Sequence, residues 1–379
     1  MKAPRLSEVT GKDVWLKYEN LQLTGSFKIR GATHFMLAHQ KEAQVRGVVA
    51  ASAGNHAQGV ACASKRLGIS CRIYMPEGSS PLKVARTESF GACVVQKGAI
   101  FDESATLAKA DSEESGRILV PAFFDKDVIA GQGTLALELL SEAPFASAQA
   151  LLVAVGGGGL AAGIGTVLRA KRPDIKIYGC SAQNAPAQAQ AFHTGVLDEK
   201  PVSFTLADGV AVKKGEPAML PLLKQSLDDV VTLPEPAIAH AIAFLLEHEK
   251  VVVEGAGALP VAALLTGLVR EQSVVLILSG GNIDLTALSS MVHYSLVEQE
   301  RIVRFKVTVP DRPGGLEKIT RILASQRANI LQVFHQRATS RANIGETEIE
   351  FDIETASKAH SQAILNQLAA DGFTVIKAV

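Results

Sequence analysis

The feature that most constrains this chain is a regular alternation of short apolar runs and helical patterns from Val48 to about Asp284. This alternation is typical of βαβ units, in which helices cover both faces of a mostly parallel sheet. Pro81 predicts the first turn of a helix that stops at Gly91. The fold class is therefore predicted to be α/β, with strands at Gly47–Ala51, Cys71–Met75, Ala92–Gln96, Ile118–Pro121, Leu151–Val155, Lys176–Gly179, Asp229–Leu233 and Val274–Leu278.

One uncharged stretch, Ala150–Leu168, is nearly long enough to span a membrane. Four consecutive glycines lie in its middle, and each would weaken a helix by about 1 kcal/mol relative to alanine. We interpret the stretch as a strand, a glycine turn and a helix, and expect no membrane association. Lys plus Arg and Asp plus Glu both total 38, so the chain has no net charge. Nucleic acid is therefore not an expected partner.

The four cysteines, Cys62, Cys71, Cys93 and Cys180, form no CxxC pair, and no secretory signal precedes them. This pattern supports neither a disulfide framework nor a zinc site. We expect reduced thiols in the core of a cytoplasmic protein.

After about residue 304 the periodicity changes. Phe305, Val307 and Val309 alternate with polar residues, which indicates a half-buried strand. Further strands are expected at 330–336, 349–353 and 373–378, and helices at 315–327 and 358–370. The order β-α-β-β-α-β predicts a ferredoxin-like α+β domain at 304–379, joined by a linker at 291–303.

Lys28 stands among small and apolar residues just before a helical pattern. Burial would lower the pKa of its amine and leave it free to form a Schiff base. The alternative is an ordinary solvated lysine near the start of a helix.

The loop Ser52-Ala53-Gly54-Asn55-His56 follows the first predicted strand and opens a helix. Backbone amides converge at a helix N-terminus, where they can bind an anion such as a substrate carboxylate. The alternative is an ordinary turn in which Asn55 serves only as the N-cap.

A second glycine-rich loop follows the most apolar strand and consists of Gly156, Gly157, Gly158, Gly159 and Leu160. Its amides can hold phosphate oxygens. A dinucleotide fingerprint, GxGxxA, also matches, but the next strand is not followed by the acidic residue that would bind a ribose. A single phosphate is favoured.

Ser279 follows another apolar strand, at the edge where ligands of open α/β folds bind. Its hydroxyl is a neutral partner for a ring nitrogen, although the segment could be a simple glycine turn. Glu254 ends a similar strand and either faces the site or favours the following helix N-terminus.

In this order, the motifs resemble the pyridoxal-phosphate enzymes of the tryptophan synthase β-subunit fold type, fold type II, and most closely threonine/serine dehydratases. The resemblance implies a two-lobed parallel-sheet catalytic domain at 1–290, with a small lobe at about 47–125. The matching segments are Gly25–Ala32, Ala51–Ala61, Val128–Thr134, Val155–Leu160, Leu206–Val210, Glu254–Ala258 and Leu278–Asp284.

The resemblance also implies roles for these residues. Lys28 would carry the pyridoxal phosphate beside Phe27, and Asn55 would contact the cofactor's ring oxygen. The loop from Gly156 to Leu160 would hold its phosphate, Ser279 would face its pyridine nitrogen, and Glu254 would also bind it. Ser52, Ala53, Gly54, Asn55 and His56 would bind the substrate. The implied reaction is β-elimination of water, which converts L-threonine into 2-oxobutanoate and ammonia, and L-serine into pyruvate.

Alternative functions are a β-replacement synthase on the same fold and a non-catalytic amino-acid sensor. Cysteine-synthase-like enzymes usually have Thr where His56 stands, and threonine synthases usually have Asp at Ile29. Racemases of this fold use a serine where this chain has Ala53. Their metal-binding carboxylates correspond to Ser181 and Ala187, so no such metal site is expected.

The second domain resembles an ACT-type amino-acid-sensing module, with residues 311–316 as the turn before its first helix. This resemblance implies a branched-chain amino acid as a candidate effector. The alternative is that the module serves only assembly. We expect a homodimer or homotetramer.

Overall fold

The computed structural model describes residues 1–199, 202–213, 215–336 and 343–377. The chain divides into two compact units, Met1–Asp284 and Leu285–Val379. Residues 291–298, which the sequence analysis assigned to a linker, continue the helix α13 (Leu285–Glu298), and residues 302–303 begin the strand β10 (Ile302–Pro310).

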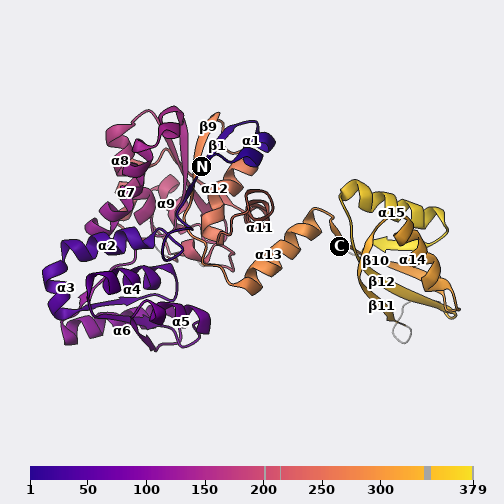
Figure 1. The fold of residues 1–379 in the computed structure, drawn as a ribbon, viewed down its shortest axis with the longest axis horizontal. Coiled ribbons are helices and arrows are strands. Elements are labelled where there is room, and N and C mark those ends of the chain that lie inside the picture. Colours follow the sequence, from indigo (N-terminus) through magenta and orange to yellow (C-terminus); the bar gives the residue numbers. More distant parts are fainter. Residues whose placement is uncertain (200–201, 214, 337–342, 378–379) are drawn as a thin grey trace. The chain divides into compact units, whose positions relative to one another are not determined.

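The larger sheet of the first unit is fully parallel, with the order β1-β9-β6-β7-β8. Every residue of β6 is buried, because helices cover both faces of the sheet (Figure 1). The strands are β1 (Asp13–Tyr18), β6 (Ala150–Ala154), β7 (Lys176–Ala182), β8 (Asp229–Leu233) and β9 (Ser273–Leu278). The sequence analysis missed β1, which lies at the edge of this sheet.

The smaller sheet has the order β4-β3-β2-β5 and is also parallel. Its strands are β2 (Val48–Ala51), β3 (Cys71–Met75), β4 (Cys93–Gln96) and β5 (Ile118–Leu119). All four cysteines are free, but Cys93 is exposed rather than in the core, because β4 is an edge strand. The α/β class and all eight strands that the sequence predicted are confirmed.

The helices of the first unit surround the two sheets (Figure 1). The helix α2 packs against α4, which contacts the smaller sheet, and against α7, which packs on α8 of the larger sheet. It therefore links the two sheets. At the start of α7, Asp125 caps the helix by accepting hydrogen bonds from the amides of Asp127 and Val128. The helices are α1 (Pro4–Thr10), α2 (Lys28–Ala38), α3 (Gln40–Arg46), α4 (Asn55–Leu67), α5 (Pro81–Ser89), α6 (Phe101–Ser115), α7 (Lys126–Ser141), α8 (Gly159–Lys171), α9 (Ala187–Thr194), α10 (Met219–Ser226), α11 (Glu235–Phe244) and α12 (Gly255–Leu265).

The uncharged stretch from residue 150 to 168 is β6, a glycine turn and most of α8, as predicted. Within the described ranges, no helix is both long and apolar enough to cross a bilayer.

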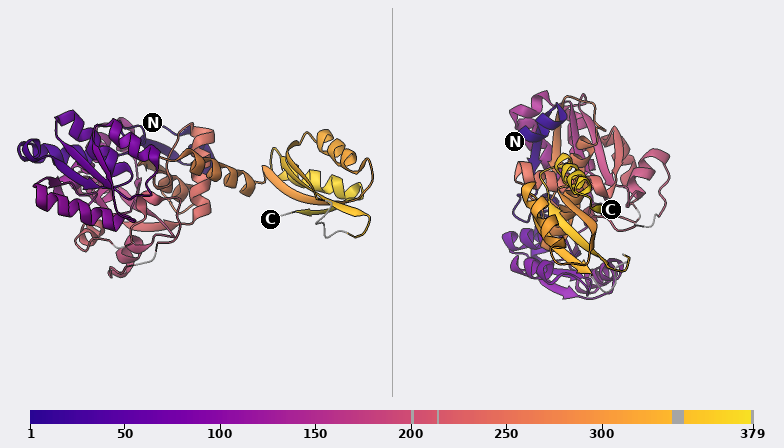
Figure 2. Two further views of the ribbon diagram at one scale, coloured as in Figure 1. Left: turned by 90° about the horizontal axis from the view of Figure 1, so that it is seen from below. Right: turned by 90° about the vertical axis from the view of Figure 1, so that its right-hand side faces the viewer.

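The second unit contains one antiparallel sheet with the order β11-β12-β10-β13. Two helices, α14 (Gly315–Ser325) and α15 (Lys358–Ala370), cover one face of it (Figure 2). The other strands are β11 (Asn329–Gln336), β12 (Glu346–Glu354) and β13 (Thr374–Lys377). The β-α-β-β-α-β order is confirmed, and Ala378, the predicted end of the last strand, lies outside the described residues.

Candidate active site

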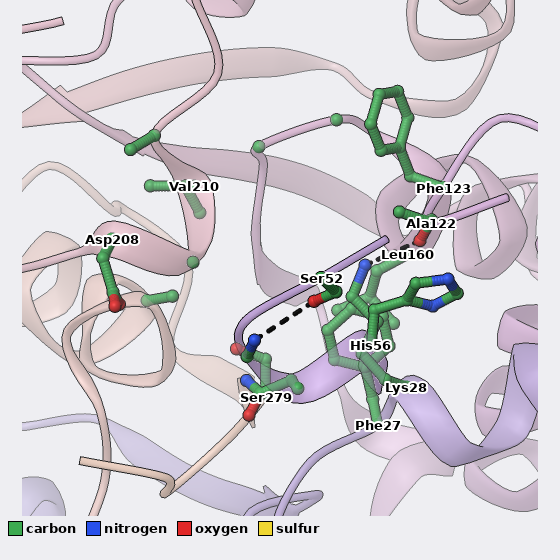
Figure 3. A pocket seen from close by; sticks show the side chains of 18 of the residues that line it. Phe27, Lys28, Ser52, His56, Ala122, Phe123, Leu160, Asp208, Val210 and Ser279 are labelled. Carbon is green, nitrogen blue, oxygen red and sulfur yellow. Dashed lines mark hydrogen bonds between the residues drawn. The ribbon is translucent and has the colours of Figure 1, made fainter. Parts of the chain in front are cut away.

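A cavity of about 400 Å³ opens where β2, β6 and β9 end (Figure 3). The carboxyl ends of parallel strands are the usual place for a ligand in such folds. Every site residue that the sequence predicted lines this one cavity. They are Phe27, Lys28, Ser52, Ala53, Gly54, Asn55, His56, Gly156, Gly157, Gly158, Gly159, Leu160, Glu254 and Ser279.

Lys28 is the first residue of α2, and its amine opens onto the cavity. Its Nζ donates a hydrogen bond of 2.7 Å to the carbonyl of Ala122 and lies 5.3 Å from the centre of the Phe27 ring. Burial lowers the pKa of Lys28 to about 8, although the negative charge of Glu254 partly opposes this. The structure thus agrees with a desolvated amine rather than a solvated surface lysine.

The start of α2 is fixed by the loop after β9. The amide of Phe27 donates to the carbonyl of Ser279 over 3.0 Å, and the amide of Gly281 donates to the carbonyl of Gly25 over 2.9 Å. These bonds hold Lys28 and Ser279 at the same cavity wall, although the two residues are distant in the sequence.

The helix α4 begins at the cavity. Gly54, not Asn55, occupies the N-cap position, and no side chain caps the helix. The alternative in which Asn55 is the N-cap is therefore wrong. The first amides of α4 have no acceptor within the helix and can bind an anion, whereas the Asn55 side chain donates to Oε1 of Glu254 over 2.7 Å.

His56 is the second residue of α4 and is buried. Its Nε2 lies 3.0 Å from the carbonyl of Val120, which accepts only and therefore assigns the ring proton to Nε2. Burial and the nearby Lys28 lower the pKa of His56 to about 3. His56 is therefore neutral at physiological pH and carries no charge into the site.

The glycine loop between β6 and α8 leaves no room for side chains. A Cβ atom at Gly157 would lie 2.4 Å from Cγ of Phe123. Gly158 has a φ of +90°, a conformation that disfavours other residues. The first turn of α8 therefore presents its backbone amides directly to the cavity, an arrangement that suits a phosphate.

Glu254 and Ser279 also line the cavity. Glu254 is the N-cap of α12, but its side chain makes no capping bond and lines the cavity instead. The strand expected to end at Glu254 is absent, because a helical segment, Leu245–Glu249, runs up to Lys250 and residues 251–254 are irregular. Burial and the neighbouring Asp208 raise the pKa of Glu254 to about 7. Ser279 immediately follows β9 and is also buried.

Sequence reasoning missed several cavity residues. Phe123 and the carbonyl of Ala122 lie beyond the end of β5, and Lys83 comes from α5. Asp208 and Asn282 lie within the segments Leu206–Val210 and Leu278–Asp284, but no role could be predicted for them because their partners are distant in the chain. Over the described part of the chain, no three His, Cys, Asp or Glu side chains gather to hold a metal ion.

Residues 1–280 match the family model described as pyridoxal-phosphate dependent enzyme. An L-threonine ammonia-lyase of Thermotoga maritima is 43% identical over 371 residues, which cover 98% of this chain and 92% of that protein. The solved threonine deaminase isoform 2 of Solanum lycopersicum has a TM-score of 0.74 and 32% identity, covering 78% of this chain and 82% of its own. The solved structure of maize serine racemase has a TM-score of 0.72 and 31% identity, covering 79% of this chain and 92% of its own. The protein therefore belongs to the family of pyridoxal-phosphate dependent enzymes.

Proposed function

We propose that this protein is a threonine ammonia-lyase, which converts L-threonine into 2-oxobutanoate and ammonia, and L-serine into pyruvate. The observation that carries the proposal is the desolvated amine of Lys28, which opens onto a cavity bounded by a helix N-terminus and a glycine loop. The relatives support the choice of substrate, because an L-threonine ammonia-lyase matches nearly the whole chain.

The residues around the cavity fit pyridoxal phosphate. The volume of about 400 Å³ suits a small cofactor with an amino acid. The amides of Gly159 and Leu160 would hold the phosphate, Asn55 would donate to the ring oxygen, and Ser279 would meet the ring nitrogen. When bound, pyridoxal phosphate supplies an aldehyde that reacts with amines and a ring that withdraws electrons from the α-carbon.

The chain's own groups then divide the work. The amides at the start of α4 orient the substrate carboxylate. Lys28, whose pKa is about 8, exists partly as a neutral amine at pH 7 and can take the α-proton at Nζ. Ser279 is uncharged and, unlike a carboxylate, would not keep the ring nitrogen protonated. This favours β-elimination over transamination. Ala53 has no group that could carry a proton on the opposite face, so we expect no efficient racemisation.

The test is to load the purified protein with pyridoxal phosphate, add L-threonine, and measure 2-oxobutanoate and ammonia. Lys28→Ala should abolish turnover and the borohydride-reducible attachment of the cofactor. Lys65→Ala is a matched control, because Lys65 is an exposed lysine whose Nζ donates to the carbonyl of Ser89 and which does not line the cavity. Cofactor binding without 2-oxobutanoate would refute the lyase assignment. If sulfide and an activated serine gave cysteine instead, the protein would be a β-replacement synthase.

We also propose that residues 304–379 form an ACT-type regulatory domain and that residues 1–290 form a catalytic domain. The ferredoxin-like order and the turn before α14 support this assignment. A branched-chain amino acid would bind at residues 311–316 and change turnover. Calorimetric titration of the full chain with L-isoleucine and L-valine tests this, and no heat with either would favour an assembly role. We expect a homodimer or homotetramer, which light scattering can measure.

A further inference from the structure

Asn282 lies on the loop after β9 and contacts three segments that are distant in the sequence. Its Nδ2 donates to the carbonyl of Thr24 and to Oδ1 of Asn55, both over 2.7 Å. Its Oδ1 accepts a hydrogen bond of 2.9 Å from Nη1 of Arg86, which belongs to α5. One amide thus connects the start of α2, the start of α4 and the helix α5.

These partners fix which way the Asn282 amide faces. The carbonyl of Thr24 can only accept a hydrogen bond, and the guanidinium of Arg86 can only donate. If the amide were turned over, its oxygen would face the carbonyl oxygen of Thr24 and its NH₂ would face the guanidinium. Both contacts would then be repulsive, so one orientation is strongly favoured.

The orientation of Asn282 in turn determines the orientation of Asn55. Because Asn282 presents a donor, Asn55 must present its oxygen to that donor. The NH₂ group of Asn55 is thereby directed to the opposite side, where it donates to Oε1 of Glu254 over 2.7 Å beside the cavity. The direction of donation runs from Arg86 through Asn282 and Asn55 to the site.

Packing around Asn282 agrees with a position that tolerates little change. A Cβ atom at Gly25 would lie 2.5 Å from Oδ1 of Asn282, and Gly25 has a φ of +71°. A larger residue at position 25 would displace the amide. Asn282 is therefore held by sterics as well as by hydrogen bonds.

We propose that Asn282 is a positioning residue that forces Asn55 to offer a hydrogen-bond donor, rather than an acceptor, to the ring oxygen of pyridoxal phosphate. This inference rests on the proposed role of Asn55 in the site. Asn282 itself does not touch the reacting atoms in this role, and the carbonyl of Thr24 together with Arg86 fixes its orientation.

The key variant is Asn282→Asp, which keeps the shape but offers only acceptors when ionised. The carboxylate would attract the NH₂ of Asn55, turn that amide over and present an oxygen to the cofactor. We expect the affinity of the apoenzyme for pyridoxal phosphate to fall about 10- to 100-fold, and the absorption band of the bound cofactor to shift.

Asn20→Asp is the matched control. Asn20 is buried, its Nδ2 donates to the carbonyl of Val252, and its Cβ lies close to Gly281 of the same loop, but its hydrogen-bond partner is not Asn55. This variant should lower the thermal stability of the apoenzyme while leaving the cofactor band and affinity unchanged. A shift with Asn282→Asp but not with Asn20→Asp separates positioning from general damage to the loop.

The decisive measurement is a double-mutant cycle with Asn55→Ala. Because Asn282 acts through Asn55, Asn282→Asp should have little further effect on affinity in the Asn55→Ala background. An undiminished effect there, or a wild-type band and affinity in Asn282→Asp alone, would overturn the inference. A wild-type protein that binds no pyridoxal phosphate would instead refute the proposed function.

Discussion

The lowered pKa of Lys28 predicts how fast the apoenzyme captures its cofactor at different pH values. Only the neutral amine attacks an aldehyde. With a pKa of about 8, about one lysine in eleven is neutral at pH 7. With the ordinary value of 10.5, about one in 3,000 would be neutral. Burial therefore increases the reactive fraction about 300-fold at pH 7.

The assay is stopped-flow absorbance of apoenzyme mixed with pyridoxal phosphate between pH 6 and 10. The observed rate should increase about tenfold from pH 6 to 7 and level off above about pH 8. Dividing by the rate with N-acetyl-lysine amide, measured at each pH, removes the titration of the cofactor itself. The ratio therefore compares Lys28 directly with a solvated lysine amine. A corrected rate that is flat from pH 6 to 10 would mean that Lys28 titrates as a solvated lysine, which would refute the argument from burial.

Further predictions concern charge, space and stability. Glu254→Gln removes a negative charge that raises the pKa of Lys28. The midpoint of the same pH profile should therefore fall below that of the wild type, and an increase would contradict this. Gly157→Ala places a Cβ 2.4 Å from an aromatic ring, and the overpacking should lower the free energy of unfolding of the apoenzyme by about 1–3 kcal/mol, measured by urea unfolding. Arg30→Ala leaves Glu19, which is 1% exposed, without its ion-pair partner. Urea unfolding should show a loss of about 3–5 kcal/mol. Glu138→Ala, at a half-exposed partner of the same arginine, should cost about 1 kcal/mol or less.

Strands were predictable wherever the sheet buries both faces, because those strands consist of uninterrupted apolar residues such as β6. The edge strand β1 escaped because its apolar run, Val14 to Leu16, is only three residues long and is flanked by Asp13 and Lys17. The strand β5 is shorter than predicted. Pro121 has no N–H to extend the ladder, so regular pairing ends at Leu119, although the amide of Val120 still reaches the carbonyl of Val49.

Most of the cavity residues could be predicted because they lie between a strand and a helix, where local sequence signals are strong. Glu254 is an exception, because no strand precedes it. Contacts between those segments could not be predicted. Nothing near Asn55 in the sequence indicates that its side chain meets Glu254 on one side and Asn282 on the other. The same holds for the carbonyl of Ala122 that holds Lys28, because a backbone acceptor leaves no signature in the sequence.

The order of strands in the larger sheet has a consequence for biosynthesis. The strand β9 is the last of the first unit to be made, yet it lies between β1, the first, and β6. A nascent chain still lacking β9 therefore has neither a complete sheet nor Ser279. We therefore expect capture of the coenzyme to follow release of this strand from the ribosome, which can occur before the second unit has been made.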